Sequence, residues 1–363
     1  MPPIRSSRVN TVDVVVPCYN YGRYLKGCVD SVLSQRGVDV RVLIVDDASP
    51  DHTPEIAAQL TALDRRVSYV RNQTNLGLIG TANKGVMEWA SADYVVLLSA
   101  DDALTQESLA RAVKLMDARS DVGLTYGMAL VMHDDGPMLE IAKVNEPEFA
   151  VVPSEVFIRR ICAYGNVVPS PCAIMRTSVQ RRIGGYNPQF KHTSDVDMWM
   201  RAAAVSSIGV VNAVQGIYRW HESNMGAAYY SQPEGDRAEM LATCRAFLEM
   251  HGRDFPRFGE WLRDMERRVG TEAILIASKA YEKIGDETWR DALKFGKKHR
   301  PDYWKCSHWW KFLFKRIVGR RATALIQRGE DRLALRCEPG KHGVWYDHGE
   351  RNGWWPAEFC TAL

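Results

Sequence analysis

The chain has 363 residues, of which 46% are hydrophobic and 25% are charged, and its formal net charge at pH 7 is +3. This composition is typical of a globular protein, and the length suffices for two or more domains with cores of their own. The net charge is too small to indicate a nucleic-acid partner by itself. Because the sequence shows neither a signal-peptide pattern at its start nor an apolar run of about 20 residues, we expect no membrane-spanning helix.

The eight cysteines are scattered along the chain without a C-x-x-C pair. This spacing argues against a structural zinc site and against a disulfide framework, so we expect reduced thiols. A cytoplasmic location follows from that expectation, with a peripheral position on the inner face of the membrane as the alternative if the C-terminal part binds lipid.

The first hundred residues alternate between short apolar runs and segments with helical periodicity. Strands are expected at 12–16, 40–45, 67–70 and 94–98. Pro17 is expected to stop the first of them. Helices are expected at 24–35, 55–63 and 82–90, with loop over 72–80. Strands that alternate with helices of about ten residues indicate βαβ units, and therefore an α/β fold with a mostly parallel central sheet and helices on both faces.

From residue 123 the pattern favours antiparallel strands and then helices. The expected elements are strands at 123–132, 173–175 and 209–218, a turn at 134–137, irregular chain over 138–170 with a short helix at 154–162, and helices at 194–204, 237–251 and 261–284. Thr193 or Ser194 would be the N-cap of the first of these helices. The last two are amphipathic and predict a helical C-terminal region.

Two acidic pairs stand at the ends of expected strands. Asp46 and Asp47 follow the second strand, and Asp101 and Asp102 follow the fourth. Right-handed crossovers place the loops after parallel strands along one edge of the sheet, which is where such sheets bind ligands. Like charges repel at such an edge, and a bound nucleotide, a divalent cation or both would remove that cost. The sequence therefore predicts an enzyme site there.

Seven short motifs lie between residues 10 and 225. They are VPCYN at 16–20, VDDASPDHT at 45–53, NLG at 75–77, ANKG at 82–85, SADD at 99–102, SDVDMWMR at 194–201 and YRWH at 218–221. In sequence and in order these motifs resemble those of glycosyltransferase family 2. The resemblance implies a GT-A fold, a nucleotide-sugar donor, a divalent metal and inversion at the anomeric carbon.

The resemblance also implies a role for each matching residue. Asp195 would be the catalytic base that takes the proton of the acceptor hydroxyl. Asp102 and His221 would bind Mn²⁺ or Mg²⁺, which neutralises the departing diphosphate. The residues implied in donor binding are Pro17, Tyr19, Asn20, Asp46, Asp47, Arg71, Asn75, Gly77, Asn83, Asp101 and Arg219. Among these, Asp46 and Asp47 would hold the nucleoside. Asp197 and Trp199 are expected to be structural.

The function that follows is a metal-dependent inverting glycosyltransferase, which moves a sugar from a UDP-type donor to a hydroxyl acceptor. A lipid-linked acceptor of surface-polysaccharide assembly is one candidate. A sugar nucleotidyltransferase and a non-catalytic sugar- or lipid-binding relative remain alternatives. A phospho-receiver domain is disfavoured, because its acidic pair follows the first strand and not the second. We expect a catalytic domain at 1–225, a helical region at 226–330 and a tail of unknown structure at 331–363.

Residues 289–321 are rich in Lys and Arg with interleaved aromatic residues. They could form an ordinary solvated helix face that packs its aromatic residues inward. The apolar character of WWKFLFKR at 309–316 favours the second interpretation, an amphipathic helix on an anionic membrane surface. No nucleic-acid recognition motif accompanies the charge, so no nucleic-acid partner is expected. The oligomeric state stays open, with a homodimer among the candidates.

Overall fold

The structure is a computed structural model that describes residues 9–133, 147–221, 224, 233–282, 286–319 and 351–361. The chain divides into two compact units. The first comprises the described residues within Met1–Ile161, Gly165–Ala227 and Trp345–Leu363. The second comprises those within Cys162–Tyr164 and Ala228–Val344.

The first unit is built on one mixed sheet in which the order of the main strands is β11-β7-β9-β6-β8-β4-β1-β2-β3. The strands are β1 (Thr11–Cys18), β2 (Asp39–Asp46), β3 (Val67–Arg71), β4 (Tyr94–Leu97), β5 (Ala103–Leu104), β6 (Val122–His133), β7 (Phe149–Val152), β8 (Ile174–Arg176), β9 (Ser207–Trp220), β10 (Arg351–Asn352) and β11 (Cys360–Thr361).

The ladders from β4 to β3 are all parallel, as expected where helices connect successive strands. Beyond β4 the sheet becomes mixed. β8 runs antiparallel to both β4 and β6, whereas the long β6 and β9 pair in parallel. The expected α/β fold with a mostly parallel sheet and a helical C-terminal region is confirmed.

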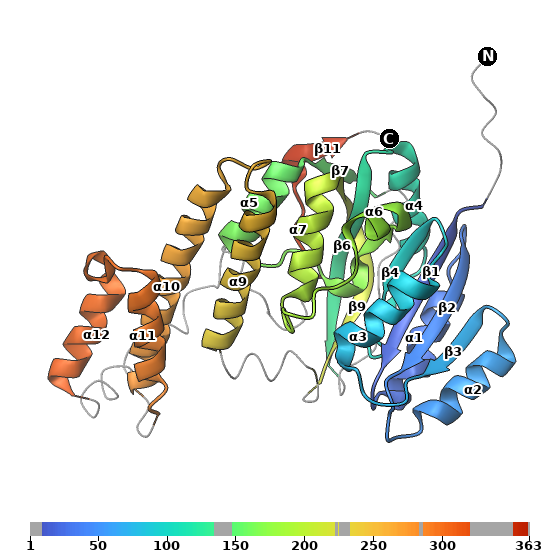
Figure 1. Cartoon of the computed structure of the whole chain (residues 1–363), viewed down its shortest axis with the longest axis horizontal. Helices are drawn as coiled ribbons and strands as arrows, with labels where there is room; N and C mark the ends of the chain where they lie inside the picture. The colour runs from blue at the N-terminus through green and yellow to red at the C-terminus, as the bar shows by residue number, and fades with distance from the viewer. Residues whose placement is uncertain are drawn as a thin grey trace, which may run out of the picture. The chain divides into compact units, whose positions relative to one another are not determined.

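Helices cover both faces of this sheet. They are α1 (Gly22–Leu33), α2 (Thr53–Leu63), α3 (Gly77–Asn83), the π-helix η1 (Lys84–Trp89), α4 (Ser108–Ala118), α5 (Ser154–Tyr164), the 3₁₀ helix η2 (Ser170–Cys172), α6 (Thr177–Ile183), α7 (Ser194–Val205) and the 3₁₀ helix η4 (Ala357–Phe359). The helices α1, α2 and α4 share an apolar core with one face of β1 and β2. On the other face lie α3, η1, α6 and α7 (Figure 1).

Neighbouring residues of β1 point to these two faces in turn. Val14 and Val16 belong to the core beneath α1, whereas the side chain of Val15 lies under Gly85 of η1. Because both faces of the strand are buried, nearly every residue of β1 is apolar and buried. The carboxyl end of the strand is thereby held rigidly between two helical layers.

Two local expectations are wrong near the sheet edge. β1 does not stop at Pro17, which is in register with Val45 of β2. On the other side β4 ends at Leu97, opposite Val15, so the missing N–H of the proline lies past the end of that ladder. The helix after β3 also begins earlier than expected, at Gly77 and inside the predicted loop 72–80.

Further along the chain, residues 149–152 form β7 where irregular chain was expected, and α4 and α6 lie where no helix was expected. The expected turn at 134–137 lies outside the described residues. The last described residues, which had no assignment from sequence, pair with the sheet: β10 joins β6 and β11 joins β7. They belong to the first unit.

The second unit is helical. It contains α9 (Pro233–His251), α10 (Phe258–Glu282), α11 (Trp289–His299), the 3₁₀ helix η3 (Tyr303–Lys305) and α12 (Ser307–Val318). α10, α11 and α12 enclose a small core in which Trp289 and Phe312 are buried beside alanines of α10. Among the described helices, none is both long enough and apolar enough to cross a membrane.

Candidate active site

The loops after β1 and β2 are bonded to each other at the carboxyl edge of the sheet. The backbone N–H of Asp47 donates to the carbonyl of Cys18 at 2.8 Å, and that of Asn20 donates to Oγ of Ser49 at 3.1 Å. Asn20 and Ala48 have φ angles of +59° and +60°. Residues other than glycine seldom adopt this left-handed conformation, and such strain concentrates at functional sites.

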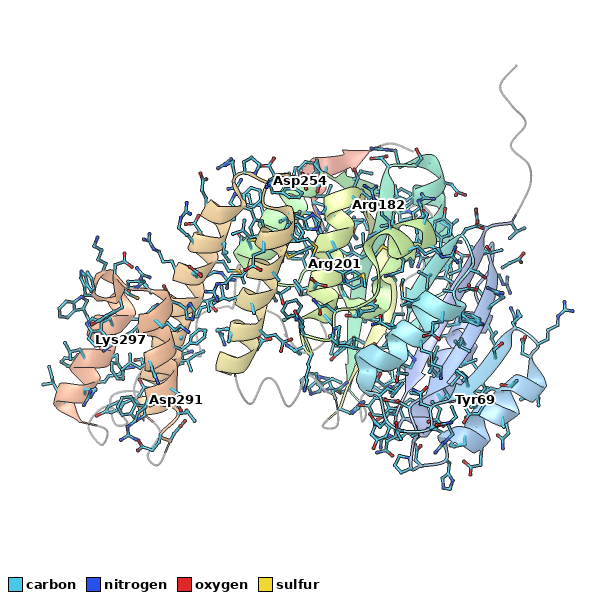
Figure 2. All side chains as sticks on the ribbon, viewed as in Figure 1. Tyr69, Arg182, Arg201, Asp254, Asp291 and Lys297 are labelled. Carbon is cyan, nitrogen blue, oxygen red and sulfur yellow. The ribbon has the colours of Figure 1, made fainter. Side chains whose placement is uncertain are left out.

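Asp46 is fully buried and bonds both to its own loop and to β3. Its Oδ1 accepts the N–H of Ser49 at 2.8 Å, and its Oδ2 accepts the hydroxyl of Tyr69 at 3.0 Å. Tyr69 lies on β3 (Figure 2). Nη1 of Arg71 lies 2.5 Å from the same Oδ2, and Nη2 donates to the carbonyl of Ser49 at 3.0 Å. Asp46 and Arg71 are therefore an ion pair that shapes the loop after β2.

Asp47 is buried beside the start of α3. Its Oδ1 accepts Nδ2 of Asn72 at 2.9 Å and the backbone N–H of Leu76 at 2.8 Å. Oδ1 of Asn72 in turn accepts Nζ of Lys84 at 2.8 Å. The buried Asn72, which sequence analysis did not single out, thus joins the second acidic residue to a lysine of η1. Its position directly after a strand was the only available signal.

Of the remaining residues predicted for donor binding, four lie at the strand edge and one, Asn83, is bonded to another part of the chain. Pro17 is buried in β1, whereas Tyr19, Asn75 and Gly77 are exposed at the strand edge, where Asn75 accepts the N–H of Gly77 at 2.9 Å. Asn83 is engaged elsewhere. Its Nδ2 donates to the carbonyl of Tyr186 at 2.8 Å, and its Oδ1 accepts the N–H of the same residue at 2.7 Å. In this structure Asn83 ties α3 to the loop after α6.

Asp101 and Asp102 lie together with the end of β9. Oδ2 of Asp101 lies 3.1 Å from Nε2 of His221, and Oδ1 of Asp102 accepts the backbone N–H of Arg219 at 3.0 Å. Nε of Arg219 donates to the carbonyl of Asp101 at 3.0 Å. Asn224, which sequence analysis missed, also donates to Oδ2 of Asp101 at 3.3 Å. The imidazole thus contacts Asp101, and not the Asp102 with which it was predicted to share a metal.

Electrostatics make this acidic pair costly. Both side chains are only 5–6% exposed. Burial raises the pKa of both carboxyl groups, and the charge of Asp101 raises the pKa of Asp102 further. A cation at this position would stabilise both ionised forms.

The side chains at this cluster fit a divalent cation by their chemistry. Carboxylates and an imidazole are ligand types that Mn²⁺ accepts. Nδ1 of His221 is buried without a hydrogen-bond partner among the described residues. Within the same part of the chain, however, no three His, Cys, Asp or Glu side chains are grouped closely enough to hold a metal ion. The cluster therefore supplies suitable donors, without a preassembled set of three.

Asp195 lies in the first turn of α7 and is half-buried. Its Oδ2 accepts Nδ2 of Asn166 at 2.8 Å and the hydroxyl of Ser170 at 3.3 Å, and its Oδ1 accepts the N–H of Val196 at 2.7 Å. Burial raises the pKa of its carboxyl group, while the nearby His192 acts in the opposite direction. A carboxylate with a raised pKa and a fixed orientation is suited to accept a proton.

The short helix η2 connects Asp195 to the acidic pair. Ser170 at its start bonds to Asp195, while the charge of Asp102 helps raise the pKa of Cys172 at its end. Asp195 thus bonds to the start of a helix of three residues, and the charge of Asp102 acts on the end of the same helix.

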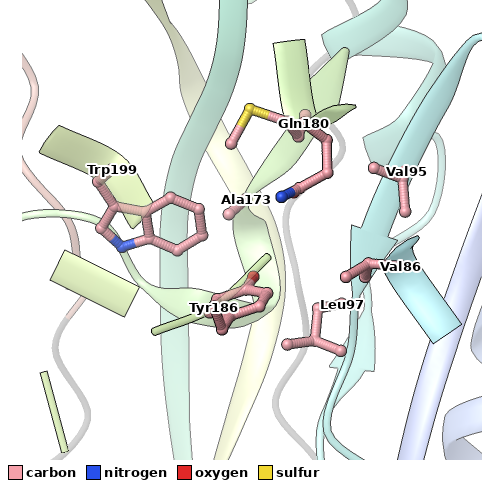
Figure 3. A pocket seen from close by; sticks show the side chains of 8 residues that line it. Val86, Val95, Leu97, Ala173, Gln180, Tyr186 and Trp199 are labelled. Atoms are coloured by element: carbon pink, nitrogen blue, oxygen red, sulfur yellow. The ribbon is translucent and has the colours of Figure 1, made fainter. Parts of the chain in front are cut away.

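A small pocket lies between the sheet and α7 (Figure 3). Its lining residues are Val86, Val95, Leu97, Ala173, Met175, Gln180, Tyr186 and Trp199. Trp199 is buried there, as expected of a structural residue, and Asp197 pairs with Arg201 at 2.7 Å. Burial and the charge of Asp195 both raise the pKa of Tyr186, so this tyrosine lies near the candidate base.

Comparison with known proteins agrees with the motifs. A family model described as Glycosyl transferase family 2 matches residues 13–149. An uncharacterized glycosyltransferase of Nostoc sp. is 31% identical over 272 residues, and the alignment covers 74% of this chain and 79% of that protein. The alignments with several other curated relatives cover less than two thirds of the length of those proteins.

Two solved structures share the fold. The first is S. aureus TarS in complex with UDP-GlcNAc, with 17% identity, a TM-score of 0.55 and coverage of 81% of this chain and 92% of that one. The second is a mannosyltransferase from Pyrobaculum calidifontis in complex with GDP-Man and Mn²⁺, with 17% identity, a TM-score of 0.53 and coverage of 91% and 81%. At such low identity the likeness shows the fold, which is the expected GT-A arrangement, and nothing more.

Proposed function

Since this chain belongs to glycosyltransferase family 2, we propose that it transfers a sugar from a nucleotide-diphosphate donor to a hydroxyl acceptor, with inversion at the anomeric carbon. The observation that carries the proposal is the placement of Asp195. It combines a raised pKa, a fixed orientation and a position across η2 from the acidic pair. A nucleotide-binding protein without transfer chemistry would have no need of such a group.

In the proposed reaction the acceptor oxygen attacks the anomeric carbon as its proton passes to Oδ2 or Oδ1 of Asp195. The bond between the anomeric carbon and the phosphate oxygen breaks, and its electron pair leaves with the nucleoside diphosphate. Attack from the face opposite the leaving group inverts the configuration. Asn166 and Ser170 hold the carboxylate of Asp195 in place for this step.

We assign the donor to the edge formed by the loops after β1, β2 and β4. The exposed Tyr19 would line the base pocket, and Asp47 would face the nucleoside through the loop that Asp46 and Arg71 shape. UDP is the proposed nucleotide, in keeping with the sequence motifs and with the UDP-GlcNAc complex of TarS. The GDP-Man complex of the other structural neighbour makes GDP-sugars the first alternative to test.

Asp102 and His221 would hold Mn²⁺ or Mg²⁺, with Asp101 beside them. When bound, the cation supplies Lewis-acid stabilisation of the diphosphate that leaves. Arg219 is anchored to both acidic residues and would place its positive charge next to the same phosphates. The Mn²⁺ in the mannosyltransferase complex supports this choice of cofactor.

Release of the nucleoside diphosphate tests the proposal directly. Purified protein is incubated with a panel of UDP- and GDP-sugars and Mn²⁺, and UDP, GDP and pyrophosphate are measured. We expect UDP release that Asp195→Asn lowers by about 100-fold to 10,000-fold, the range for a general base. The control Asp39→Asn changes an exposed aspartate at the opposite end of β2 and should leave the rate unchanged.

Other products would point to other functions. Release of pyrophosphate from UTP and a sugar 1-phosphate, supplied in place of the nucleotide-sugars, would identify a sugar nucleotidyltransferase. Donor binding without any turnover would identify a non-catalytic relative. Full turnover by Asp195→Asn would remove this residue from the role of base.

For the acceptor we propose a lipid-linked hydroxyl compound, which α12 would help the enzyme reach by lying on the cytoplasmic face of a membrane. One side of α12 is apolar yet exposed: Trp310, Phe314 and Ile317 are 56%, 58% and 77% exposed and lie at positions i, i+4 and i+7. The opposite side packs inward through Phe312. Within the basic and aromatic segment 289–321, α12 thus has a packed side and an exposed side.

The charges around this exposed stripe favour an anionic membrane as its partner. Lys305, Lys311 and Arg316 are exposed in the same segment, and residues 303–319 contain no Asp or Glu. Aromatic and branched side chains between basic residues are typical of helices that bind at the headgroup level. A negatively charged protein surface would match the basic residues. It would, however, bury the three large apolar side chains less deeply than a membrane would.

Flotation with vesicles tests the membrane contact. Full-length protein should float with vesicles that contain phosphatidylglycerol, less so at high salt, and not with pure phosphatidylcholine. Phe314→Glu should abolish flotation, whereas Met250→Glu, which changes a 66% exposed residue of α9, should not. Equal flotation of both variants would reject the assignment. Loss of self-association by Phe314→Glu alone would identify the stripe as an interface between copies of this chain.

A further inference from the structure

Two tyrosines from the start of α1 contact the imidazole of His221. The ring of Tyr24 stacks on it, with centroids 5.2 Å apart and an interplanar angle of 20°. The ring of Tyr21 meets it edge-on, at 5.2 Å and 86°. The two tyrosines also contact each other, at 5.9 Å and 72°. The rings of Tyr21, Tyr24 and His221 thus form one cluster. The two tyrosines follow the first sequence motif, and the histidine ends the last one.

Tyr24 also contacts the arginine of this region. The guanidinium of Arg219 lies 4.9 Å from the centroid of the Tyr24 ring, and that of Arg23 lies 4.5 Å from it. Arg219 is the residue whose backbone and side chain bond to Asp102 and Asp101. One half-buried aromatic ring therefore contacts the guanidinium groups of Arg23 and Arg219, of which Arg219 is bonded to the acidic pair.

The hydrogen bonds of His221 leave this ring only half fixed. Nε2 lies beside Asp101, but Nδ1 is buried without a hydrogen-bond partner among the described residues. Histidines that bind metals are normally oriented by a hydrogen bond from the second ring nitrogen to a carboxylate or carbonyl. Because no such bond to Nδ1 is present among the described residues, the ring contacts help to set the plane of the imidazole.

We propose that Tyr24 is a positioning residue that fixes the plane of His221 and the guanidinium of Arg219, with Tyr21 limiting the tilt of the imidazole. Tyr24 itself touches neither metal nor donor. The proposal rests on the metal role of His221 given above. Its requirement is an aromatic ring at position 24, not a hydroxyl group.

Binding of Mn²⁺ in the presence of UDP tests this without any turnover. Free Mn²⁺ is measured by electron paramagnetic resonance for wild type, Tyr24→Phe and Tyr24→Leu. We expect Tyr24→Leu to raise the Kd for Mn²⁺ by about 10-fold to 100-fold, as for lost orienting partners of metal ligands, and Tyr24→Phe to change it little. Tyr164→Leu, at an exposed tyrosine of α5, is the control and should have no effect.

A double-mutant cycle with His221→Ala separates the two proposals. If Tyr24 acts through His221, Tyr24→Leu should add nothing to the loss of Mn²⁺ affinity caused by His221→Ala. If His221→Ala weakens Mn²⁺ binding and Tyr24→Leu does not, the positioning role is wrong while the metal role stands. If His221→Ala leaves the affinity unchanged, the metal role itself is wrong.

The fold of each variant is checked by thermal unfolding. Should Tyr24→Leu fail to fold, Tyr24→Met provides an apolar, unbranched side chain at the same position and is measured in its place. A Tyr24→Phe variant as weak in Mn²⁺ binding as the leucine variant would overturn the requirement for a ring.

Discussion

Asp195 and Asp197 lie two positions apart at the start of α7 and have entirely different partners. Asp195 bonds to neutral groups and has a raised pKa, because burial removes water from its carboxylate. Asp197 is buried against Arg201, which also donates to the carbonyls of Ile183 and Gly185. The first arrangement favours proton transfer, and the second favours a stable fold.

The stabilities of two matched variants should reflect this difference. The raised pKa means that folding favours the protonated form of Asp195, so its ionised form lowers the stability at any pH above that pKa. Asp195→Asn should therefore unfold at a urea concentration no lower than wild type. Asp197→Asn leaves the buried Arg201 without its charge partner and should cost about 3 kcal/mol. Urea unfolding at pH 7 measures both. A large destabilisation by Asp195→Asn would mean that this residue is structural.

The rate of transfer should depend on pH through the same carboxylate. The base must be ionised, so kcat/KM should rise with pH until the Asp195 proton is lost. Because the pKa is raised, this rise should occur at a higher pH than for an exposed aspartate, whose pKa is about 3.9. His192 and Tyr186 are titratable groups of the described residues that also interact with this carboxylate. A rate profile at saturating Mn²⁺ that is flat down to pH 4 would contradict the assignment.

At the scale of elements, the close packing of η1 on β1 fixes the position of Lys84, which bonds to Asn72 of the candidate site. A Cβ atom at Gly85 would overlap the side chain of Val15. The helix axis can therefore approach the sheet only because this position has no side chain. The same π-helix carries Lys84, which reaches Asn72 and through it Asp47.

Substitution of this glycine should loosen that contact. Gly85→Ala is expected to cost about 1–3 kcal/mol through overpacking, and Val15→Ala should restore part of the loss by making room. Gly27→Ala is the matched control, since nothing lies within 4 Å of a Cβ at that helical position. It should stabilise the protein by about 0.5–1 kcal/mol. Urea unfolding compares the four proteins, and equal costs for both glycines would refute close packing as the cause.

The early start of α3 shows how a long-range contact changes a local element. Residues 72–80, which include two asparagines and two glycines, were expected to form a loop. In the structure Asp47 accepts the N–H of Leu76, and Asn75 accepts that of Gly77, so the first donors of the helix are satisfied. One of these acceptors lies 29 residues away along the chain. No local pattern could have indicated it.

At the scale of the whole molecule, the two compact units should respond differently to the donor. UDP with Mn²⁺ binds the folded state and should stabilise it by about 2.7 kcal/mol at a concentration about 100 times the Kd. Hydrogen exchange should locate the protection in the first unit, at the loops 46–49 and 99–102, and leave α12 unchanged. UDP with EDTA is the control and should protect less. Equal protection without metal would argue against Asp102 and His221 as ligands.

The residues of the site were thus predictable to different degrees. The motifs identified both acidic pairs, the helix that carries Asp195 and the strand that precedes His221. They did not identify Asn72, Asn224, Tyr21 or Tyr24, since a single polar or aromatic residue near a strand end has no distinctive local signal. They also paired His221 with Asp102, whereas its imidazole contacts Asp101.

The order of strands and helices in the first hundred residues, the α/β class and the family were determined by the sequence alone, because hydrophobic periodicity and short motifs are properties of neighbouring residues. Only the tertiary structure decided which side chains share a partner: Asn83 with the backbone of Tyr186, Arg71 with Asp46, and Tyr24 with the imidazole of His221. Such pairs depend on how the crossovers set one loop against another. Hydrogen bonds and ring contacts are selective within a few ångströms, and chain connectivity does not specify positions at that scale.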